Sequence, residues 1–600
     1  MDFYFKKFED RKPYSPVPYS VTRELIWQFF AVIAVVMGAW YLHWRWTASI
    51  NWDAAWFAIP LVIAETCSFI GTIFFVINIW KVKDTEQKPP PHYINECIRD
   101  KDIPQRPISV DLFIATYNED TELVRLSIQD AKKIRYPYDD IEFRIAVLDD
   151  GRRPEMRKVT EEEGVGYHSR TNNIGYKAGN LRNAMEQTSG DFIIICDADT
   201  RPFPTLMERT LGYFRDPDVA WIQAPQWFYD VPQGKRLKYV MKQYLWYPGY
   251  YIGAAIEKVI GEVWVGLDRF ASDPQMFYDI IQRRRNWANA AFCCGASSIH
   301  RREAVMEAAM KSFARSVDEQ VHAATDDILD VELKDTLSDA MKRELLLETE
   351  LTPYKFHVSE DIYTSIVLHS DRERNWKSVF HPFPESKMLS PQDLETWTVQ
   401  RFKYAGGSLD IALTDNPVFK KGLRLPQKLM YGATFWSYFS GLWNLVFLFA
   451  PIIYLFTGIA PVNAFSFDFY KHVLAFLLAN EIAMTIGTWG VPGWTGTATY
   501  LAFFPINMRA LWKVLIGEEI KFPTTRKDRA EGNFFHLVTP QFAIIVLTIL
   551  GLLYGTYKIL SGQSDNLAGL LTNVFWGLNN VAALSGMVRA SNWDPKDDEV

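Results

Sequence analysis

The sequence predicts an α/β domain inserted between two groups of membrane-spanning α-helices. Apolar residues make up 48% of the 600-residue chain, and its long uncharged windows lie toward the two ends. In the middle, short apolar runs alternate with amphipathic stretches, as in an open, mostly parallel sheet. We expect a membrane region at 1–90, a cytosolic domain at 91–425 and a second membrane region at 426–600.

Six apolar windows are long enough to cross a hydrocarbon core of about 30 Å. They lie at 25–42, 55–80, 435–459, 470–489, 538–560 and 570–588. The first window is too long for a signal-peptide core and has no small-residue cleavage site after it, which favours a retained anchor. An amphipathic stretch at 499–517 predicts a helix at the membrane interface.

The distribution of basic residues predicts the orientation of these spans. Lysine and arginine lie before the first window, after the second, and between the fourth and the fifth. The loops at 458–469 and 561–569 contain neither. Because positive charge favours the cytoplasmic side, we expect the middle domain and both termini to be cytoplasmic.

Charge and cysteine content argue against a nucleic-acid partner and against a zinc site. A net charge of -7 argues against nucleic acid as a partner. The five cysteines are odd in number and lack zinc-ligand spacing. Since they lie in the membrane or the cytosolic domain, we expect reduced thiols.

Polar and acidic residues close three strand-like runs of the middle domain. The runs at 110–115, 143–148 and 192–196 end in Thr116-Tyr117-Asn118-Glu119, Asp149-Asp150-Gly151 and Asp197-Ala198-Asp199, and a fourth run lies at 219–223. Ligands of open α/β sheets bind beyond the carboxyl ends of the strands, so we expect one crevice here. The chain lacks a Gly-x-Gly-x-x-Gly turn after the first strand and a Gly-Lys-Ser/Thr loop, which excludes the common dinucleotide and P-loop sites.

The Asp-x-Asp pair and a nearby lysine predict a site for a metal ion and phosphate groups. Asp197 and Asp199 offer the oxygen ligands that suit Mg²⁺, or Mn²⁺ in its place. Such a pair alone is also common in solvated turns. Lys177, in Lys177-Ala178-Gly179-Asn180, would add a point charge, and Gly179 would permit close backbone approach.

In their order these motifs resemble those of the processive family-2 glycosyltransferases, the group that includes bacterial cellulose synthase, curdlan synthase, and the chitin and hyaluronan synthases. The match runs from about Ile108 to the C-terminus and includes Cys294-Gly295, Ser359-Glu360-Asp361 and Gln400-Arg401-Phe402-Lys403-Tyr404. The resemblance implies a GT-A fold, a multi-pass protein of the bacterial inner (plasma) membrane, and inverting transfer of glucose from UDP-glucose to a nascent β-glucan.

The resemblance also implies a role for each matched residue. Asp361, beside Glu360, occupies the position of the general base, although an acid in a first helical turn capped by Ser359 would look similar. The implied donor-binding residues are Thr116, Tyr117, Glu119, Asp149, Lys177 and Asp197, with Asp199 on the metal. Cys294 and Gly295 would lie beside the acceptor.

Two segments depart from the family pattern. Where the family has Gln-x-x-Arg-Trp, this chain has Gln400, Lys403 and Tyr404. Lysine keeps the charge without the planar fork, and tyrosine has a smaller ring, so the product could be a 1,4-, 1,3- or mixed-linkage β-glucan. The segment at 522–527 resembles the gating loop Phe-x-Val-Thr-x-Lys and would direct Phe522, Thr525 and Lys527 toward the donor; a plain basic loop is the alternative.

Two other functions stay open at this point. One is a chitin- or hyaluronan-type synthase that uses UDP-N-acetylglucosamine, and the other is an inactive nucleotide-sugar-binding regulator or transporter. Since Asp199 and Asp361 are retained, the inactive protein is disfavoured. Aromatic residues at helical spacing in the last four spans favour a polysaccharide channel, and accessory export proteins are further candidate partners.

Two features bear on regulation. A charged, helix-prone insert near 307–350 is either a regulatory or oligomerising element or a solvated helical hairpin. Cyclic-di-GMP-binding domains follow the last span in bacterial cellulose synthases, but this chain ends soon after its sixth window. We therefore expect no such domain in this chain.

Overall fold

The computed structural model describes residues 3–100, 102–231, 234–266, 270, 274–326, 328, 330–348, 351–491, 493–520 and 532–593. Its α-helices are α1 Val21–Ala48, α2 Ala55–Asn78, α3 Thr121–Ala131, α4 Pro154–Glu162, α5 Tyr176–Gln187, α6 Leu206–Thr210, α7 Leu237–Ile260, α8 Arg302–Thr325, α9 Val331–Glu348, α10 Glu360–His369, α11 Leu394–Thr414, α12 Leu425–Tyr438, α13 Ser440–Thr457, α14 Phe467–Thr488, α15 Gly493–Ala502, α16 Phe504–Leu515, α17 Thr539–Leu560 and α18 Leu567–Ala590. Its strands are β1 Ser109–Thr116, β2 Glu142–Asp149, β3 Gly166–His168, β4 Phe192–Asp197, β5 Arg201–Pro202, β6 Val219–Gln223, β7 Trp227–Phe228, β8 Lys235–Arg236, β9 Trp264–Val265, β10 Ser298–Arg301, β11 Lys377–Phe380 and β12 Ser386–Met388.

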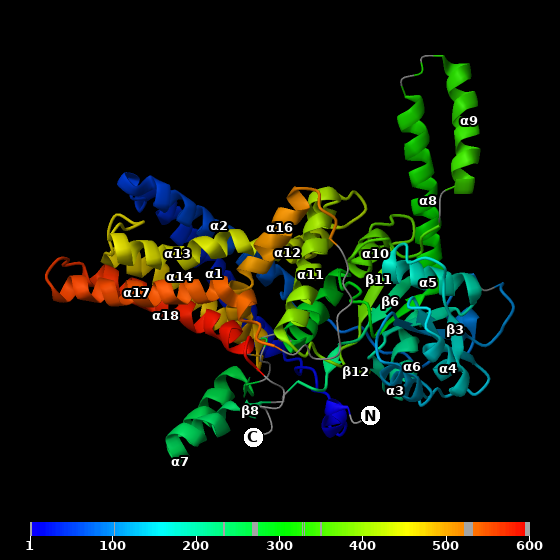
Figure 1. Cartoon of the computed structure of the whole chain (residues 1–600), viewed down its shortest axis with the longest axis horizontal. Helices are drawn as coiled ribbons and strands as arrows, with labels where there is room; N and C mark the ends of the chain where they lie inside the picture. Colours follow the sequence, from blue (N-terminus) through cyan, green and yellow to red (C-terminus); the bar gives the residue numbers. More distant parts are fainter. Residues whose placement is uncertain are drawn as a thin grey trace.

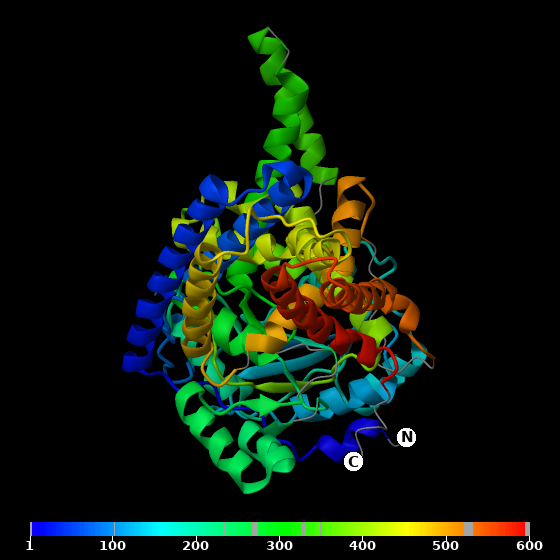
Figure 2. The same ribbon diagram turned by 90° about the vertical axis from the view of Figure 1, so that its left-hand side faces the viewer.

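The α/β domain and the long helices occupy opposite ends of the molecule (Figure 1). The large sheet lies at one end, and α13, α17 and α18 extend toward the other. The pair α8 and α9 projects away from both parts, and α7 projects at another margin, as the view from the helix end also shows (Figure 2). The predicted division into an α/β part and flanking helices is therefore present.

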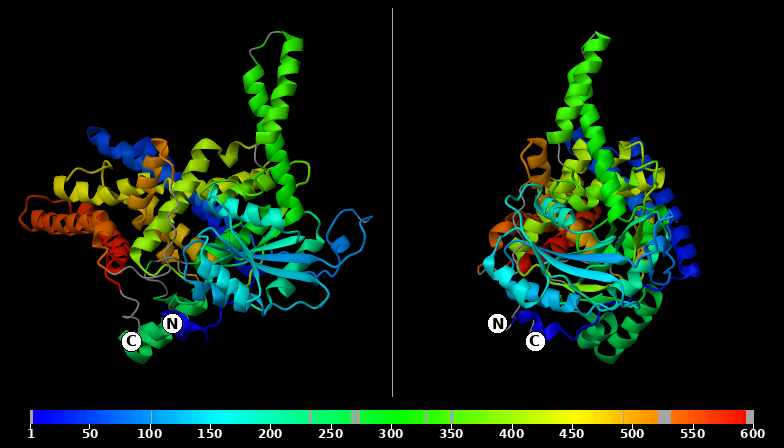
Figure 3. Two further views of the ribbon diagram at one scale, coloured as in Figure 1. Left: turned by 45° about the vertical axis from the view of Figure 1, so that its right-hand side comes forward. Right: turned by 90° about the vertical axis from the view of Figure 1, so that its right-hand side faces the viewer.

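The described strands form a seven-stranded mixed sheet with the order β11-β6-β10-β4-β1-β2-β3, seen side by side in Figure 3. Strand β10 is antiparallel to β4 and β6, and the other pairs are parallel. The four runs predicted from the sequence all form strands of this sheet. Short additional sheets join β5, β12 and β7, and β8 and β9.

Alternation along β1 explains how the sheet is covered on both faces. Val110, Leu112 and Ile114 pack with α3 and α4, whereas Phe113 points to the other face with Leu181 of α5. Successive side chains of a strand point to opposite faces, so an apolar run of this length must be buried on both. The domain core consequently has two apolar layers, one on each side of the sheet.

The register of the parallel strands brings the acidic strand ends to one level. Thr116 at the end of β1 pairs with Asp149 at the end of β2. The preceding residue, Ala115, pairs with Asp197 at the end of β4. The three predicted motifs therefore meet at the same edge of the sheet.

Among the described residues, five helical segments are long and apolar enough to cross a membrane. They are Val21–Ala48, Trp52–Asn78, Ser440–Thr457, Phe535–Leu560 and Leu567–Ala590. The window at 470–489 forms α14, which is not one of the five because Asp468, Lys471 and Glu481 make it more polar. The number of six spans and their orientation stay predictions.

Two expected helices are each divided in the structure. The window at 435–459 is split at Phe439, which lies between α12 and α13. The stretch at 499–517 is split at Phe503, because Pro505 in the first turn of α16 cannot continue α15. Helix α16 packs Ala510 and Leu511 against Ala405 and Leu409 of α11.

The charged insert near 307–350 contains α8 and α9, which form a helical hairpin that projects from the α/β domain (Figure 1). Ion pairs link the two arms, with Lys342 Nζ 3.1 Å from Asp318 Oδ1 and Lys334 Nζ 3.3 Å from Asp326 Oδ1. The predicted helical character is confirmed, and a regulatory or oligomerising role stays a prediction.

Candidate active site

The turn after β1 is locked by a carboxylate and presents an aromatic ring. Glu119 Oε2 accepts hydrogen bonds from the Tyr117 backbone N–H and from Thr116 Oγ1, each at 2.8 Å. The Tyr117 side chain is then left 44% exposed at the edge of the sheet. Glu119 thus supports the turn, and Tyr117 offers a ring face on which a planar group could stack.

Asp149, at the end of β2, is fully buried and saturated with donors. It accepts hydrogen bonds from the backbone N–H of Gly151 at 3.1 Å and of Arg153 at 2.7 Å, and from the Tyr167 hydroxyl at 3.2 Å. Arg153 Nη2 also donates to Thr116 Oγ1 at 2.8 Å, which ties the ends of β1 and β2 together. In this structure Asp149 therefore stabilises the turn after β2 from its buried position.

The next residue, Asp150, holds the segment that leads into α5. Its carboxylate pairs with Arg170 through two contacts of 2.7 and 2.8 Å. Arg170 Nη2 also donates to the Tyr176 carbonyl at 2.7 Å. A Cβ on Gly179 would lie 2.0 Å from the Ile174 carbonyl oxygen. The close approach predicted at Gly179 is therefore made by the protein's own loop.

Helix α5 carries Lys177 to the end of β4, where its ammonium pairs with Asp197 Oδ1. Burial acts to lower the pKa of Lys177, but the charges of Asp197 and Glu360 outweigh it and raise the pKa. Lys177 is therefore a fixed positive charge at the strand ends. The Asp197 side chain is 42% exposed, so one side of this ion pair faces the opening.

Asp199 lies deeper, with 1% of its surface exposed. Its Oδ2 accepts the backbone N–H of Leu389 at 3.2 Å. In the described part of the chain, no three His, Cys, Asp or Glu side chains gather in a way that could hold a metal ion. Carboxylates of the Asp-x-Asp pair still fit Mg²⁺ or Mn²⁺ where substrate phosphates supply further oxygen ligands.

Helix α10 begins with the two adjacent acids, Glu360 and Asp361. The side chain of Ser359 makes no capping hydrogen bond, and Asp361 Oδ1 accepts the N–H of Ile362 at 2.8 Å. Burial and the neighbouring Asp361 raise the pKa of Glu360 to about 7, and burial raises the pKa of Asp361. Proton exchange near neutral pH is a property of this pair, as a general base requires.

Gly295 lies between the lysine and the acids. It has φ +83°, and a Cβ there would lie 3.6 Å from Lys177 Nζ and 3.7 Å from Asp361 Oδ2. A left-handed conformation favours glycine. The backbone of this loop, the ammonium of α5 and the carboxylate of α10 thus meet at one point.

The two cysteines before this glycine are held by polar side chains. The Cys294 N–H donates to Gln223 Oε1 at 2.7 Å, and Gln282 Nε2 donates to Cys294 Sγ at 3.2 Å. Burial raises the pKa of Cys293 to about 12 and the pKa of Cys294 well above its usual value. Both thiols stay protonated, and all five cysteines of the chain are free.

Helix α11 carries Lys403 and Tyr404 to the group formed by Asp197, Glu360 and Asp361. Burial lowers the pKa of Lys403 to about 8, against the charges of Glu360 and Asp197, which act to raise it. The Tyr404 side chain is 40% exposed, and Gln400 is partly buried one turn earlier. The replacements in the family motif therefore lie beside the acids of α10.

Comparison with known proteins assigns this domain. Residues 111–308 match the description Glycosyl transferase family 2. The UDP-forming cellulose synthase catalytic subunit of Pseudomonas fluorescens (strain SBW25) is 27% identical over 577 residues, which cover 94% of this chain and 66% of that protein. Residues 111–308 thus form a family-2 glycosyltransferase domain, and the chain as a whole is similar to cellulose synthase catalytic subunits.

A second cellulose synthase subunit is similar to this chain over nearly its whole length. The cellulose synthase 1 catalytic subunit (UDP-forming) of Komagataeibacter xylinus is 25% identical over 572 residues, covering 93% of this chain and 66% of that protein. The chain thus spans just under two thirds of the length of these relatives. Among solved structures, the mannosyltransferase PcManGT from Pyrobaculum calidifontis, in complex with GDP-Man and Mn²⁺, has a TM-score of 0.45 and 13% identity, covering 77% of this chain and all of that one. The mixed sheet of the glycosyltransferase domain is the GT-A fold that the resemblance implied.

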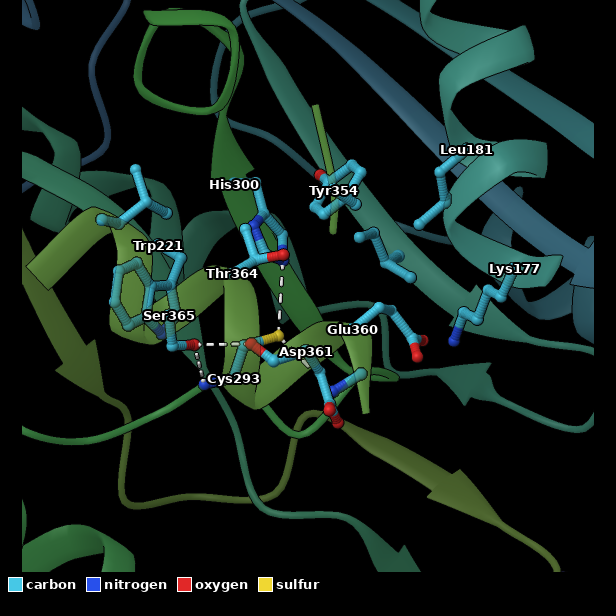
Figure 4. A pocket seen from close by; sticks show the side chains of 13 residues that line it. Lys177, Leu181, Trp221, Cys293, His300, Tyr354, Glu360, Asp361, Thr364 and Ser365 are labelled. Carbon is cyan, nitrogen blue, oxygen red and sulfur yellow. Dashed lines mark hydrogen bonds between the residues drawn. The ribbon is translucent and has the colours of Figure 1, made fainter. Parts of the chain in front are cut away.

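Sequence reasoning missed a cavity behind the acids of the glycosyltransferase domain. It is a small space that lies between Lys177 and Glu360 on one side and His300 and Tyr354 on the other (Figure 4). His300 Nδ1 and the Tyr354 hydroxyl are buried and have no hydrogen-bond partner within the described residues. Burial lowers the pKa of His300 to about 3, so its ring is neutral. Neither residue belongs to a recognisable motif.

The roles of Arg170, Arg153 and Arg401 were also missed. The Arg401 guanidinium lies 5.5 Å from the Trp397 ring centroid, 5.9 Å from Tyr404 and 5.7 Å from Phe503. Arg401 therefore makes cation–π contacts with the Tyr404 ring and with two neighbouring rings.

The predicted gating-loop residues Phe522, Thr525 and Lys527 lie outside the described residues. Their roles stay predictions.

Proposed function

We propose that this chain is a processive, inverting β-glucan synthase that transfers glucose from UDP-glucose to the non-reducing end of a growing polysaccharide. The observation that carries the proposal is the meeting of Lys177, Gly295 and Asp361 at the strand ends of a family-2 domain. The Lys177 ammonium is thereby available to the leaving diphosphate, and the Asp361 carboxylate is available to the acceptor hydroxyl. The similar cellulose synthase catalytic subunits are UDP-forming, which supports a UDP-sugar as the donor.

Asp361 is the proposed general base, with Glu360 beside it. Its carboxylate removes the proton of the acceptor hydroxyl, the hydroxyl oxygen bonds to the anomeric carbon, and the bond from that carbon to the UDP oxygen breaks. One displacement of this kind inverts the configuration. Burial raises the pKa of Asp361, which strengthens its carboxylate as a base.

Lys177, Asp197 and Asp199 would hold the diphosphate end of the donor, with Mg²⁺, or Mn²⁺, on the two carboxylates. A divalent ion bound there would neutralise charge on the leaving diphosphate. Because Lys177 pairs directly with Asp197, the lysine also keeps that carboxylate oriented toward the opening.

The uridine would lie against the edge of β1 and β2. Tyr117 supplies the exposed ring, while Thr116, Glu119 and Asp149 hold the turns that position it. A uracil ring stacked on tyrosine gains the contact energy of two aromatic faces.

The acceptor end would lie along Cys294, Gly295 and α11. Tyr404 would stack with the terminal sugar, Gln400 would donate to its hydroxyls, and Lys403 would supply charge toward the diphosphate. A smaller ring than tryptophan leaves the sugar more freedom to turn, which decides the attacking hydroxyl. The proposal therefore includes 1,4-, 1,3- and mixed-linkage products.

The polymer would cross the membrane through a channel between the C-terminal helices. Helices α12 and α13 carry Trp436 and Trp443, whose rings stack at 5.5 Å between centroids. Trp436 also donates to the Cys67 carbonyl of α2 at 3.1 Å, so α2 and α12 are joined. Aromatic faces of this kind are suited to sugar rings.

The test supplies membranes that contain the protein with radiolabelled UDP-glucose or UDP-N-acetylglucosamine, each with and without Mg²⁺. Linkage-specific glucanases then digest the insoluble product. We expect metal-dependent polymer from UDP-glucose alone. Polymer formed only from UDP-N-acetylglucosamine would replace the glucan proposal with a chitin- or hyaluronan-type synthase, and the lack of turnover with both donors would contradict an active enzyme.

A further inference from the structure

Helix α7 is a hairpin with an exposed aromatic tip. Its backbone turns at Trp246, with φ 54° and ψ -143°, and Pro248 lies in the first turn of the second arm. The exposed fractions are 78% for Tyr244, 79% for Trp246, 66% for Tyr247 and 69% for Tyr251. So much exposed aromatic surface in one place marks an interaction site.

Glycines, and not an apolar core, hold the two arms together. A Cβ on Gly249 would lie 2.2 Å from the Met241 carbonyl oxygen, and one on Gly253 would lie 2.5 Å from Lys238 Cα. Within the described part of the chain, the buried residues of α7 are these two glycines and Glu257. A helix in water depends on burying an apolar face, whereas Gly-x-x-x-Gly contacts are typical of helices packed in lipid.

Polarity changes along the hairpin from its base to its tip. At the base, Arg236 Nη2 lies 2.7 Å from Glu257 Oε2 and 2.7 Å from Glu262 Oε1. Residues 243–256, which include the tip, contain no charged side chain. Lys242 lies just outside this stretch, with its ammonium 4.8 Å from the Tyr247 ring centroid. Tyrosine and tryptophan favour the membrane interface, and a lysine beside them can reach lipid phosphates.

The base of the hairpin adjoins the membrane helices. The N–H of Gly490, just after α14, donates to the Ile260 carbonyl at 3.0 Å. A Cβ on Gly261 would lie 2.7 Å from that same nitrogen. Helix α14 in turn packs Ala479 and Ala483 with Ala31 of α1, the first candidate span. The hairpin is thus continuous with the surface that must meet lipid, and Figure 1 shows α7 extending from β8 toward the side occupied by α17 and α18.

We propose that α7 is a monotopic membrane anchor whose aromatic tip enters the lipid leaflet on the side of the α/β domain. The occupant of its exposed surface is phospholipid, with the rings at the boundary of headgroups and acyl chains and Lys242 at the phosphates. Amphipathic elements of this kind sit about 5–10 Å deep in the interface. The anchor gives the glycosyltransferase domain a further contact with the bilayer, beside the spanning helices.

The test uses the full chain in nanodiscs of phosphatidylcholine and phosphatidylglycerol. Trp246→Cys and, as the matched control, Ala324→Cys in the projecting arm α8 are each labelled with an environment-sensitive fluorophore; the unsubstituted protein gives the background from native thiols. Nitroxide lipids labelled at a shallow acyl position, and aqueous iodide, serve as quenchers. We expect the label at position 246 to be quenched several-fold more strongly by the lipids than the label at 324, and the order to reverse with iodide.

Equal iodide quenching at the two positions would overturn the proposal. Protection of position 246 from both quenchers would also overturn it, because a second copy or another protein would then cover the tip. Tyr251→Cys, on the second arm, repeats the measurement if Trp246→Cys disturbs the turn. The same result is expected there, and it does not depend on which sugar the enzyme transfers.

Discussion

At the scale of single residues, two lysines and two adjacent acids set the charge of the candidate active site. Lys177 is held positive by Asp197 and Glu360, whereas burial brings the pKa of Lys403 down to about 8. Burial also raises the pKa of Glu360 to about 7. The charge of this group of residues therefore changes across the range in which the enzyme would work.

The substitution Asp361→Asn tests the base. It keeps the shape of the side chain and removes its basicity, so kcat should fall by about 10²–10⁴-fold while affinity for UDP, measured by calorimetry, stays near that of the parent. The matched variant Glu360→Gln should lose less. Full activity in Asp361→Asn would show that another group takes the proton.

The substitution Lys403→Arg tests the charge on α11 through pH dependence. Lysine is charged below its pKa, so kcat/KM for UDP-glucose should decline as pH rises through about 8. Arginine stays charged, and the alkaline decline should move upward by more than about one pH unit.

The acid side of that profile is an internal control. A base with a raised pKa loses its ionised form as pH falls, so kcat/KM should drop as pH falls through the range set by Asp361 and Glu360. This limb should be retained in Lys403→Arg. An unchanged alkaline limb in that variant would mean that Lys403 does not carry the charge that matters.

At the scale of elements, Lys177, Asp197 and Asp361 lie at the ends of helices or strands, whereas Lys403 and Tyr404 lie in the middle of α11. Arg170 holds the loop before α5, which directs Lys177 to the end of β4. Helix α11, which carries Lys403 and Tyr404, packs on α16 from the membrane side. Motion of α16 would therefore reach Lys403 and Tyr404, on the proposed acceptor side, more directly than Lys177, on the proposed donor side.

The substitution Gly179→Ala tests the positioning of α5. Its Cβ would meet a backbone carbonyl oxygen at 2.0 Å, so the loop must shift. Overpacking of this kind costs about 1–3 kcal/mol, which should lower the Tm of the purified protein and weaken UDP binding. Gly586→Ala, which has no atom within 4 Å of its Cβ, should change neither value. UDP affinity equal to that of the parent in Gly179→Ala would separate this loop from donor binding.

At the scale of the whole molecule, the α/β domain and the loops at the far ends of the spans should face opposite sides of the membrane. We expect a membrane-impermeant maleimide to label Gln563→Cys, between α17 and α18, in intact cells. Ala324→Cys, on α8, should be labelled only after permeabilisation. Labelling of both positions from the same side would contradict the orientation and the secretion of product across the membrane.

Much of the site could be predicted because its residues occur in local motifs. Asp149 and Asp197 follow short apolar runs that favour buried strands, and parallel pairing then brings their ends to one level. Asp361 and Lys403 were found through family motifs of a few consecutive residues. Their roles as base and charge carrier stay predictions.

Other features depend on contacts between residues far apart in the chain. Arg170 pairs with Asp150, and His300 and Tyr354 line the same pocket as Glu360 and Asp361. No local sequence pattern predicts either arrangement. The split of a predicted span at Phe439 also follows from packing, because apolar windows show length but not where a helix bends.

The sequence by itself determined the long apolar windows, the strand ends and the order of the motifs, because these depend on periodicity and neighbouring residues. Only the tertiary structure decided that Gly295 lies between Lys177 and Asp361, that Asp149 is saturated by its own domain, and that Trp246 stands at the tip of an exposed hairpin. Each of these follows from how separate elements pack, which no short stretch of sequence contains.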